Sequence, residues 1–250
     1  MLAKLYSSLG RLKRWLLGQK IYASPPEVER AELAFYLDYI KPGMTVFDAG
    51  ANVGDITLLF ARLVGTTGHV HSFEACGTTF EKLSRACSQS NSTQVAINHK
   101  AVSDREARLR LHVYDEEHSG WNSLAARPLQ NYGIDVKPTH IEEVEAVTID
   151  GYCRENGISH IDLLKIDVEG AEFQVLAGAR GMLETHSIDC CVFEFGATTF
   201  DMGNRPDDIK IYLGQLGYNI RNVVKGDPVF PGGAAAETAC FSIHAARPVL

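Results

Sequence analysis

The feature that most constrains the fold is an alternation of short β-branched runs with amphipathic helical segments. The runs at 45–48 and 69–73 are each followed by apolar residues at helical spacing. These stripes consist of Ile56, Leu59, Phe60 and Leu63 after the first run, and Phe80, Leu83 and Cys87 after the second. Such a βαβα pattern predicts an α/β fold, with helices on both faces of a doubly wound, mostly parallel, Rossmann-like sheet.

The rest of the chain continues this pattern. Further strands are predicted at 95–102, 161–167 and 188–195, and a helix at 171–183. Another helix carries Ile209, Tyr212, Leu213 and Leu216. Segments 222–224 and 240–244 flank a Pro/Gly-rich turn, which predicts an antiparallel hairpin that closes one edge of the sheet.

One insertion interrupts the alternation. The stretch between Val102 and Ile161 is far longer than the dozen or so residues that a crossover helix requires. Within it, Leu109, Leu111 and Val113 alternate with charged residues, which predicts an added strand. Residues 115–140 carry scattered Gly and Pro and are expected to form a long loop that acts as a lid or binding segment.

The first 42 residues are interpreted as a helical extension, followed by one domain over 43–250. Residues 1–20 place leucines at helical spacing, and five cations (Lys4, Arg11, Lys13, Arg14 and Lys20) lie among them without an acid. This basic amphipathic helix is expected either to lie on an anionic membrane or a partner, or to dock on its own domain. A second helix is predicted to begin at 24–27 and to end at 41–43.

Charge and cysteine content narrow the class of protein. The net charge is -7, and without the five N-terminal cations the chain has 19 basic and 31 acidic residues, so no nucleic-acid partner is expected. No apolar run reaches the roughly 18 residues of a membrane-spanning helix. The six cysteines include no CxxC pair and are expected to be reduced thiols. We therefore expect a cytoplasmic protein, with peripheral contact at the inner membrane surface through residues 1–20.

A glycine-rich turn at 46–55 marks the predicted ligand site, because it joins the first strand to the first helix. A dinucleotide fingerprint would need glycine at 50, 52 and 55, but Asn52 and Asp55 stand at two of these positions. Asp55 would also repel a pyrophosphate. A nicotinamide-dependent oxidoreductase is therefore the less favoured alternative.

The residues around the turn favour an adenosine that carries an amino acid. Asp48 offers a carboxylate to a ligand ammonium, and Asn52 tolerates a left-handed turn. Glu74 ends the second strand, where an acid can accept both ribose hydroxyls. Together with Gly50 and Gly54, these residues predict a site for S-adenosylmethionine.

Several segments resemble the FkbM family of S-adenosylmethionine-dependent methyltransferases. They are VFDAGANVGDIT (46–57), VHSFEA (70–75), AVSD (101–104), NSL (122–124), VTIDGYC (147–153) and IDLLKIDVEGAEFQVLAGA (161–179). The resemblance implies a class I methyltransferase fold of seven strands, the last antiparallel, and O-methylation of a sugar, polyketide or other small polyhydroxylated acceptor. It also adds Val102, in AVSD, to the cofactor-binding residues.

A second group of carboxylates is expected where cofactor and acceptor meet. Asp167 and Glu169 follow the fourth strand of the predicted sheet, beside the first, at the switch point where such sheets bind ligands. Glu194 ends the next strand between two aromatic residues, where an unused carboxylate would need a buried cation. These three are the predicted catalytic residues, although Glu169 and Glu172 could instead cap the following helix.

Methyl transfer to a hydroxyl requires alignment of the reactants and removal of a proton. A carboxylate could take the proton, or Asp167 and Glu194 could supply half of a Mg²⁺ site. His118 in the long loop is the alternative base. A non-catalytic, membrane-associated member of the family is a further alternative.

Overall fold

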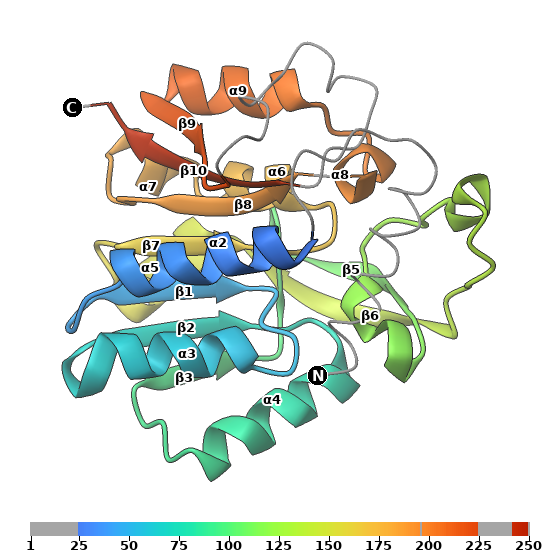
Figure 1. Ribbon diagram of the computed structural model, residues 1–250, viewed down its shortest axis with the longest axis horizontal. Helices are drawn as coiled ribbons and strands as arrows, with labels where there is room; N and C mark the ends of the chain where they lie inside the picture. Colours follow the sequence, from blue (N-terminus) through green and yellow to red (C-terminus); the bar gives the residue numbers. More distant parts are fainter. Residues whose placement is uncertain (1–24, 196, 225–241, 250) are drawn as a thin grey trace.

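The structure, a computed structural model, describes residues 25–195, 197–224 and 242–249. Its centre is a seven-stranded sheet in the order β3-β2-β1-β7-β8-β10-β9 (Figure 1). The strands are β1 (Thr45–Ala49), β2 (His69–Phe73), β3 (Val95–Asn98), β7 (Leu163–Ile166), β8 (Cys191–Phe195), β9 (Tyr218–Asn222) and β10 (Ser242–Pro248). Only β10 runs antiparallel to its neighbours β8 and β9. The predicted doubly wound sheet with an antiparallel last strand is therefore confirmed.

Helices cover both faces of the sheet. They are α2 (Pro25–Tyr39), α3 (Asp55–Val64), α4 (Gly77–Gln89), α5 (Ile149–Asn156), α6 (Glu172–Gly178), α7 (Arg180–Glu184), α8 (Ala197–Asp201) and α9 (Pro206–Gln215). In Figure 1, α2 and α3 lie in front of the sheet, whereas α5, α6 and α7 lie behind it.

Neighbouring residues of one strand pack into two different hydrophobic cores, one on each face of the sheet. Val46 of β1 packs with Tyr36 of α2 and Phe60 of α3. Its neighbour Phe47 packs on the other face with Tyr152 of α5. Because successive side chains of a strand point to opposite faces, a strand between two helical layers is buried at every position, as β7 is; its three apolar residues flank one buried charge, Lys165.

The insertion forms a second sheet in the order β4-β6-β5, made of β4 (Ala101–Val102), β5 (Ala107–Val113) and β6 (His140–Val147). It lies beyond the carboxyl ends of the main strands (Figure 1). The predicted added strand is confirmed as β5. The prediction of one strand over 95–102 is wrong, because the chain leaves the main sheet after β3 and enters the second sheet at β4.

Two other boundaries differ from the sequence prediction. The helix expected over 171–183 is divided into α6 and α7 around Ala179, which has a non-helical backbone. The predicted antiparallel hairpin at the sheet edge is confirmed as β9 and β10, but β9 spans Tyr218–Asn222 rather than 222–224. Residues 240 and 241 of the expected last strand lie outside the described residues.

The described helices include none that is long and apolar enough to cross a membrane. The predicted amphipathic helix at 1–20 lies outside the described residues, as does Cys240. The five described cysteines are buried and free, namely Cys76, Cys87, Cys153, Cys190 and Cys191.

Candidate active site

A cavity of about 270 Å³ opens at the carboxyl ends of the parallel strands, where the second sheet approaches the first. Of the residues predicted from sequence, Gly50, Asn52, Glu74, Val102, Asp167, Glu169 and Glu194 line it. The insertion contributes Ser119, Gly120, Asn122 and Leu124 to its wall. The expected cofactor and catalytic residues therefore share one space.

The glycine-rich turn forms the floor of this cavity. Gly50 has φ +82°, and a Cβ there would lie 1.8 Å from the backbone oxygen of Asp167, so only glycine fits. Asn52 has φ +50°, the left-handed conformation expected for it. Gly54 does not line the cavity; a Cβ there would lie 2.7 Å from the side chain of Leu83. Its role in the structure is close packing of α3 on α4 rather than contact with a ligand.

Glu74 lies at the carboxyl end of β2 and is held by the backbone. Its carboxylate accepts hydrogen bonds from the N–H groups of Asn52 and Cys76, each at 2.9 Å. Burial raises its pKa to about 7, although those two N–H groups oppose the shift. Beside it, Asn52 Oδ1 is buried and makes no hydrogen bond within the described part of the chain. These oxygens fit a ligand that presents hydroxyl or ammonium donors.

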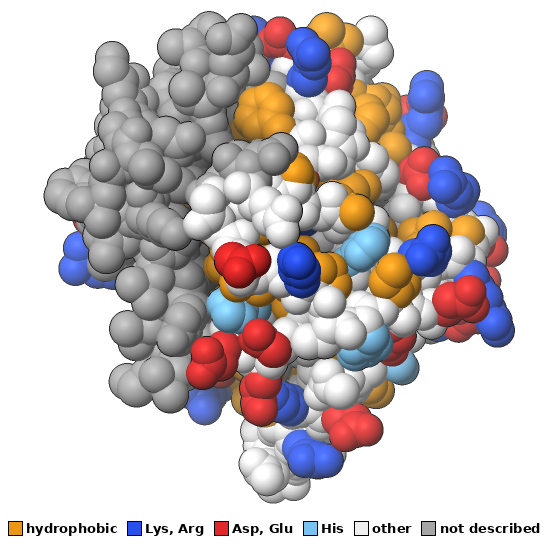
Figure 2. Space-filling view, turned by 90° about the vertical axis from the view of Figure 1, so that its right-hand side faces the viewer, with side chains coloured by type: hydrophobic (Ala, Val, Ile, Leu, Met, Phe, Trp, Pro, Cys, Tyr) orange, Lys and Arg blue, Asp and Glu red, His pale blue; other side chains and the backbone are white. Residues whose placement is uncertain are grey.

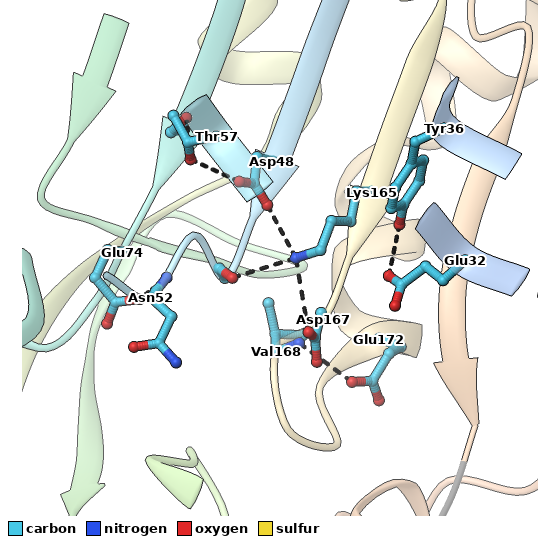
Figure 3. Close-up of polar contacts among 12 residues, drawn as sticks. Glu32, Tyr36, Asp48, Asn52, Thr57, Glu74, Lys165, Asp167, Val168 and Glu172 are labelled. Atoms are coloured by element: carbon cyan, nitrogen blue, oxygen red, sulfur yellow. Dashed lines mark hydrogen bonds and ion pairs between the residues drawn. The ribbon is translucent and has the colours of Figure 1, made fainter. Parts of the chain in front are cut away.

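The structure corrects the role expected for Asp48. Its side chain is fully buried beneath the cavity and does not face it. Instead, Lys165 Nζ lies 2.9 Å from Asp48 Oδ1, and Thr57 Oγ1 donates to Asp48 Oδ2 at 2.7 Å (Figure 3). Asp48 therefore orients Lys165, because a buried carboxylate so close to an ammonium is stable only when paired.

Lys165 is the cationic group that the sequence reasoning missed. Its ammonium also lies 3.3 Å from the backbone oxygen of Gly50 and 3.7 Å from Asp167 Oδ2 (Figure 3). Burial by itself would lower the pKa of Lys165, but Asp48 and Asp167 outweigh that effect and raise it. Lys165 lines the cavity and so places a permanent positive charge between the glycine-rich turn and Asp167.

The turn after β7 is held in a tight conformation. Glu172 Oε1 accepts hydrogen bonds from the N–H groups of Val168 and Gly170, at 3.3 and 3.0 Å. A Cβ at Gly170 would lie 2.3 Å from the backbone oxygen of Thr198. Glu172 is buried and does not line the cavity; because both N–H groups precede α6, its carboxylate stabilises the turn rather than capping the helix.

Glu169, at the centre of this turn, has the left-handed φ of +53°. Burial raises the pKa of its carboxyl group to about 8; Arg127 lowers it, and the carboxylates of Asp167, Glu194 and Glu172 raise it. Arg127 Nη1 lies 3.5 Å from Glu169 Oε2. A carboxyl group with this pKa is suited to proton transfer near neutral pH.

His118 does not line the cavity, in contrast to the alternative that made it the base. It lies in a 3-10 helix, η2 (Glu116–Trp121), with its Nδ1 at 2.6 Å from Asp115 Oδ1 and its ring packed against Trp121. The neighbouring Ser119 and Gly120 face the cavity instead. His118 therefore stabilises the insertion.

The strand ends do not form a preformed cation site. Among the described residues, the one group of three acidic, His or Cys ligands close enough to share an ion is His160, Asp162 and Asp189. These residues lie at the other end of β7 and β8, whereas Asp167 and Glu194 belong to no such group. The Lys165 ammonium beside Asp167 also competes with a cation there. The predicted Mg²⁺ site therefore receives no support from the described donors.

The first helix also contributes to the cavity, which the sequence did not reveal. Glu29, Glu32 and Leu33 of α2 line its far wall. Their i, i+3, i+4 spacing shows that they share a face, but nothing in the sequence indicated where that face docks.

Figure 2 looks onto the end of the molecule at which the second sheet lies. Side chains of both charges are interspersed there with hydrophobic ones, and the visible Lys and Arg residues form no continuous patch.

Comparison with known proteins identifies the family. The Methyltransferase FkbM domain matches residues 48–220. The 31-O-demethyl-FK506 methyltransferase FkbM of Streptomyces tacrolimicus is 31% identical over 222 residues, which are 77% of this chain and 78% of that protein. The 2-O-methyltransferase NoeI of Sinorhizobium fredii (strain NBRC 101917 / NGR234) is 27% identical over 154 residues, 57% of this chain and 60% of that one.

A solved structure from Clostridium thermocellum, described as a candidate rRNA methylase, has a TM-score of 0.50 at 12% identity and covers 89% of this chain and 97% of its own. At that identity the likeness concerns the fold alone, which is that of a class I methyltransferase. The match to the family domain and the relative in Streptomyces tacrolimicus carry the assignment further. The chain belongs to the FkbM family and is an S-adenosylmethionine-dependent methyltransferase.

Proposed function

We propose that this enzyme methylates a hydroxyl oxygen of a small polyhydroxylated acceptor, such as a sugar or a polyketide. The observation that carries the proposal is the single cavity that joins Gly50, Asn52 and Glu74 to the carboxylates Asp167 and Glu169. A donor held by the first group would end beside the second group, where an acceptor hydroxyl could lose its proton. Two relatives support oxygen as the target, because their names describe 31-O and 2-O methyl groups.

The residues of the turn and of β2 would hold the cofactor. Glu74 would accept hydrogen bonds from the ribose hydroxyls, and Val102 would contact the adenine. The oxygen of Asn52 would accept from the amino group of the methionine portion, and the Lys165 ammonium would attract its carboxylate. When bound, the cofactor supplies an activated methyl group on a sulfonium.

Glu169 is the base that we favour among the three predicted catalytic residues. Its raised pKa makes the ionised carboxylate a stronger proton acceptor than an ordinary glutamate, and its side chain lines the cavity. Asp167 lies 3.7 Å from Lys165, which suits it to orienting the donor end. Glu194 lies on the neighbouring strand and would bind acceptor hydroxyls.

The cavity walls are consistent with an acceptor of mixed polarity. Leu33, Leu111, Leu124 and Ile243 give apolar contact, whereas Glu29, Glu32, Glu169 and Glu194 offer hydrogen-bond acceptors. A ring or chain with several hydroxyl groups would use both kinds of surface. The carboxylates disfavour acceptors that carry phosphate or carboxylate groups.

The test uses S-adenosylmethionine with a deuterated methyl group and a panel of sugars, glycolipids and polyketides. Mass spectrometry should detect a labelled methyl ether on at least one neutral polyol, with S-adenosylhomocysteine formed in equal amount. Labelled methyl transferred to nitrogen or carbon instead, with polyols unmodified, would contradict the proposal. Calorimetric titration with S-adenosylhomocysteine and with NADH checks the cofactor independently of the acceptor.

We further propose that residues 1–20 bring the enzyme to an anionic membrane surface. Their five cations and helical leucine spacing support this. Sedimentation with phosphatidylglycerol vesicles should capture the full chain at low salt and release it at high salt, whereas a chain lacking residues 1–20 should stay unbound. Equal binding by both chains would contradict the proposal.

A further inference from the structure

Arg127 is a buried cation in the insertion, and it connects three segments that are distant in sequence. Its side chain is only 4% exposed. Its Nη1 lies 3.5 Å from Glu169 Oε2, in the turn after β7, and its Nε donates to Asp201 Oδ2, in α8, also at 3.5 Å. The Asp201 side chain is 2% exposed. A single guanidinium thus bridges a carboxylate of the cavity wall and a second, buried one.

The same turn is held by the insertion at a second point. Ser123 Oγ donates a hydrogen bond to the backbone oxygen of Glu169 at 2.8 Å. Glu169 therefore contacts the insertion through both its side chain and its backbone. This double contact fixes a residue whose left-handed backbone is unfavourable for a glutamate.

The insertion residues next to these contacts form the wall of the cavity. Ser119, Gly120, Asn122 and Leu124 line it, and Trp121 lies between them with its ring centroid 5.8 Å from the Arg127 guanidinium. Arg127 Nη1 makes no hydrogen bond within the described part of the chain, only the 3.5 Å ion pair to Glu169.

A purely structural ion pair would not need a partner in the cavity. Asp201 alone could balance the charge of Arg127, because both side chains are buried. The guanidinium is instead shared with Glu169, and its planar fork can direct two nitrogens to two different carboxylates.

We propose that Arg127 is a positioning residue: it orients the Glu169 carboxylate and docks the wall formed by residues 119–124 over the acceptor end of the cavity. This inference rests on the proposed function, because it assigns Arg127 to the site where the acceptor hydroxyl would be deprotonated. It adds a determinant of acceptor binding that lies outside the cofactor residues.

The experiment uses Trp121 as a reporter. The chain has two tryptophans, so Trp15→Phe leaves Trp121 as the only one. Acrylamide quenching of Trp121 is compared in this background for Arg127→Met, Arg127→Lys and Arg154→Met. Arg154 is the matched control, because it is exposed and lies 4.0 Å from Glu106. A double change, Arg127→Gln with Asp201→Asn, removes both charges of the buried pair together and is used if Arg127→Met fails to fold.

We expect the quenching constant to rise about two-fold or more in Arg127→Met, less in Arg127→Lys, and not at all in Arg154→Met. The changes in the quenching constant caused by Arg127→Met and by Glu169→Gln should be non-additive, because each substitution removes the same ion pair. With an acceptor from the screen above, kcat should fall about ten-fold or more while KM for S-adenosylmethionine stays the same.

Unchanged quenching in a folded Arg127 variant, or additive effects of the two changes, would overturn the inference. Loss of S-adenosylhomocysteine affinity to the same extent in Arg127→Met and Arg127→Lys would also overturn the inference, because Arg127 would then support the whole fold. Failure of the unmodified protein to bind S-adenosylhomocysteine would instead contradict the proposed function. The quenching comparison needs neither cofactor nor acceptor, so the two failures can be distinguished.

Discussion

Lys165 Nζ lies 2.9 Å from Asp48 Oδ1, and this fully buried pair joins β7 to β1 directly beneath the cavity. The side chains are 4% and 0% exposed, so neither charge is compensated by water. The pair links stability to function, because the same ammonium lies next to Gly50 and Asp167. Asp48, which the sequence predicts to hold the ammonium of the cofactor, is instead paired with a lysine 117 residues away.

Removing Lys165 should destabilise the protein strongly. Lys165→Met leaves Asp48 charged and buried, so the free energy of unfolding is expected to fall by about 3–5 kcal/mol in urea denaturation. Lys82→Met is the matched control, since its pair with Glu116 is exposed, and it should cost no more than about 1 kcal/mol. Addition of Asp48→Asn to Lys165→Met should restore part of the loss; no recovery would contradict the pairing argument.

Cofactor affinity should depend on pH through Glu74. Its pKa of about 7 means that the carboxyl group is mostly protonated at pH 6 and mostly ionised at pH 8. Only the ionised form can accept hydrogen bonds from both ribose hydroxyls, so affinity for S-adenosylhomocysteine should rise about ten-fold between these pH values. Calorimetry at several pH values measures this rise.

The matched variants for this prediction are Glu74→Gln and Glu142→Gln. Glu74→Gln should remove the pH dependence and weaken binding at pH 8 by about 1.5–3 kcal/mol. Glu142 accepts a backbone hydrogen bond from Gly77 but does not line the cavity, so its variant should behave like the unmodified protein. A pH dependence that survives in Glu74→Gln would assign the effect to another group.

The main sheet could be predicted because burial on both faces leaves a strong signal. In β1 and β7, successive apolar residues serve two helical layers, and the helices between them keep a clear 3.6-residue period. In contrast, β6 was missed because it is only half-buried: Val144 and Ala146 are its buried residues among exposed glutamates. Two buried apolar positions are too few to indicate a strand.

The site could be predicted only where the backbone itself fixes the residue type. Gly50 and Asn52 were found because their left-handed conformations restrict the sequence, and Glu74 because it ends a strand at a known edge. Lys165 and Arg127 were missed because their partners are far away in the chain. A lysine in an apolar strand is a signal of a buried ion pair, but its partner is defined only by the register of β1 and β7.

Helix α2 should belong to the folding unit, although the sequence placed it in an extension. Tyr36 is fully buried, packs edge-on against Phe60 at 4.9 Å, and donates a hydrogen bond to Glu32 at 2.8 Å. Tyr36→Ala should lower the free energy of unfolding by about 3–5 kcal/mol, whereas Leu37→Ala, at a 57% exposed position, should change it by about 0.5 kcal/mol or less. If Tyr36→Ala and Leu37→Ala changed the free energy of unfolding equally in thermal or urea denaturation, the domain boundary would lie after α2.

The last prediction separates the roles of the three carboxylates in the cavity. Glu169→Gln keeps the shape of the side chain but removes the proton acceptor, so kcat should fall about 10²-fold or more with S-adenosylmethionine affinity unchanged. Asp167→Asn should instead weaken cofactor binding, because Asp167 shares the Lys165 ammonium with Asp48. Glu194→Gln should mainly raise KM for the acceptor. EDTA should leave all activities unchanged, since the donors at the strand ends do not form a cation site. If Asp167→Asn loses turnover at normal cofactor affinity while Glu169→Gln remains active, Asp167 is the base. Inactivation by EDTA that Mg²⁺ reverses would establish a metal role for Asp167.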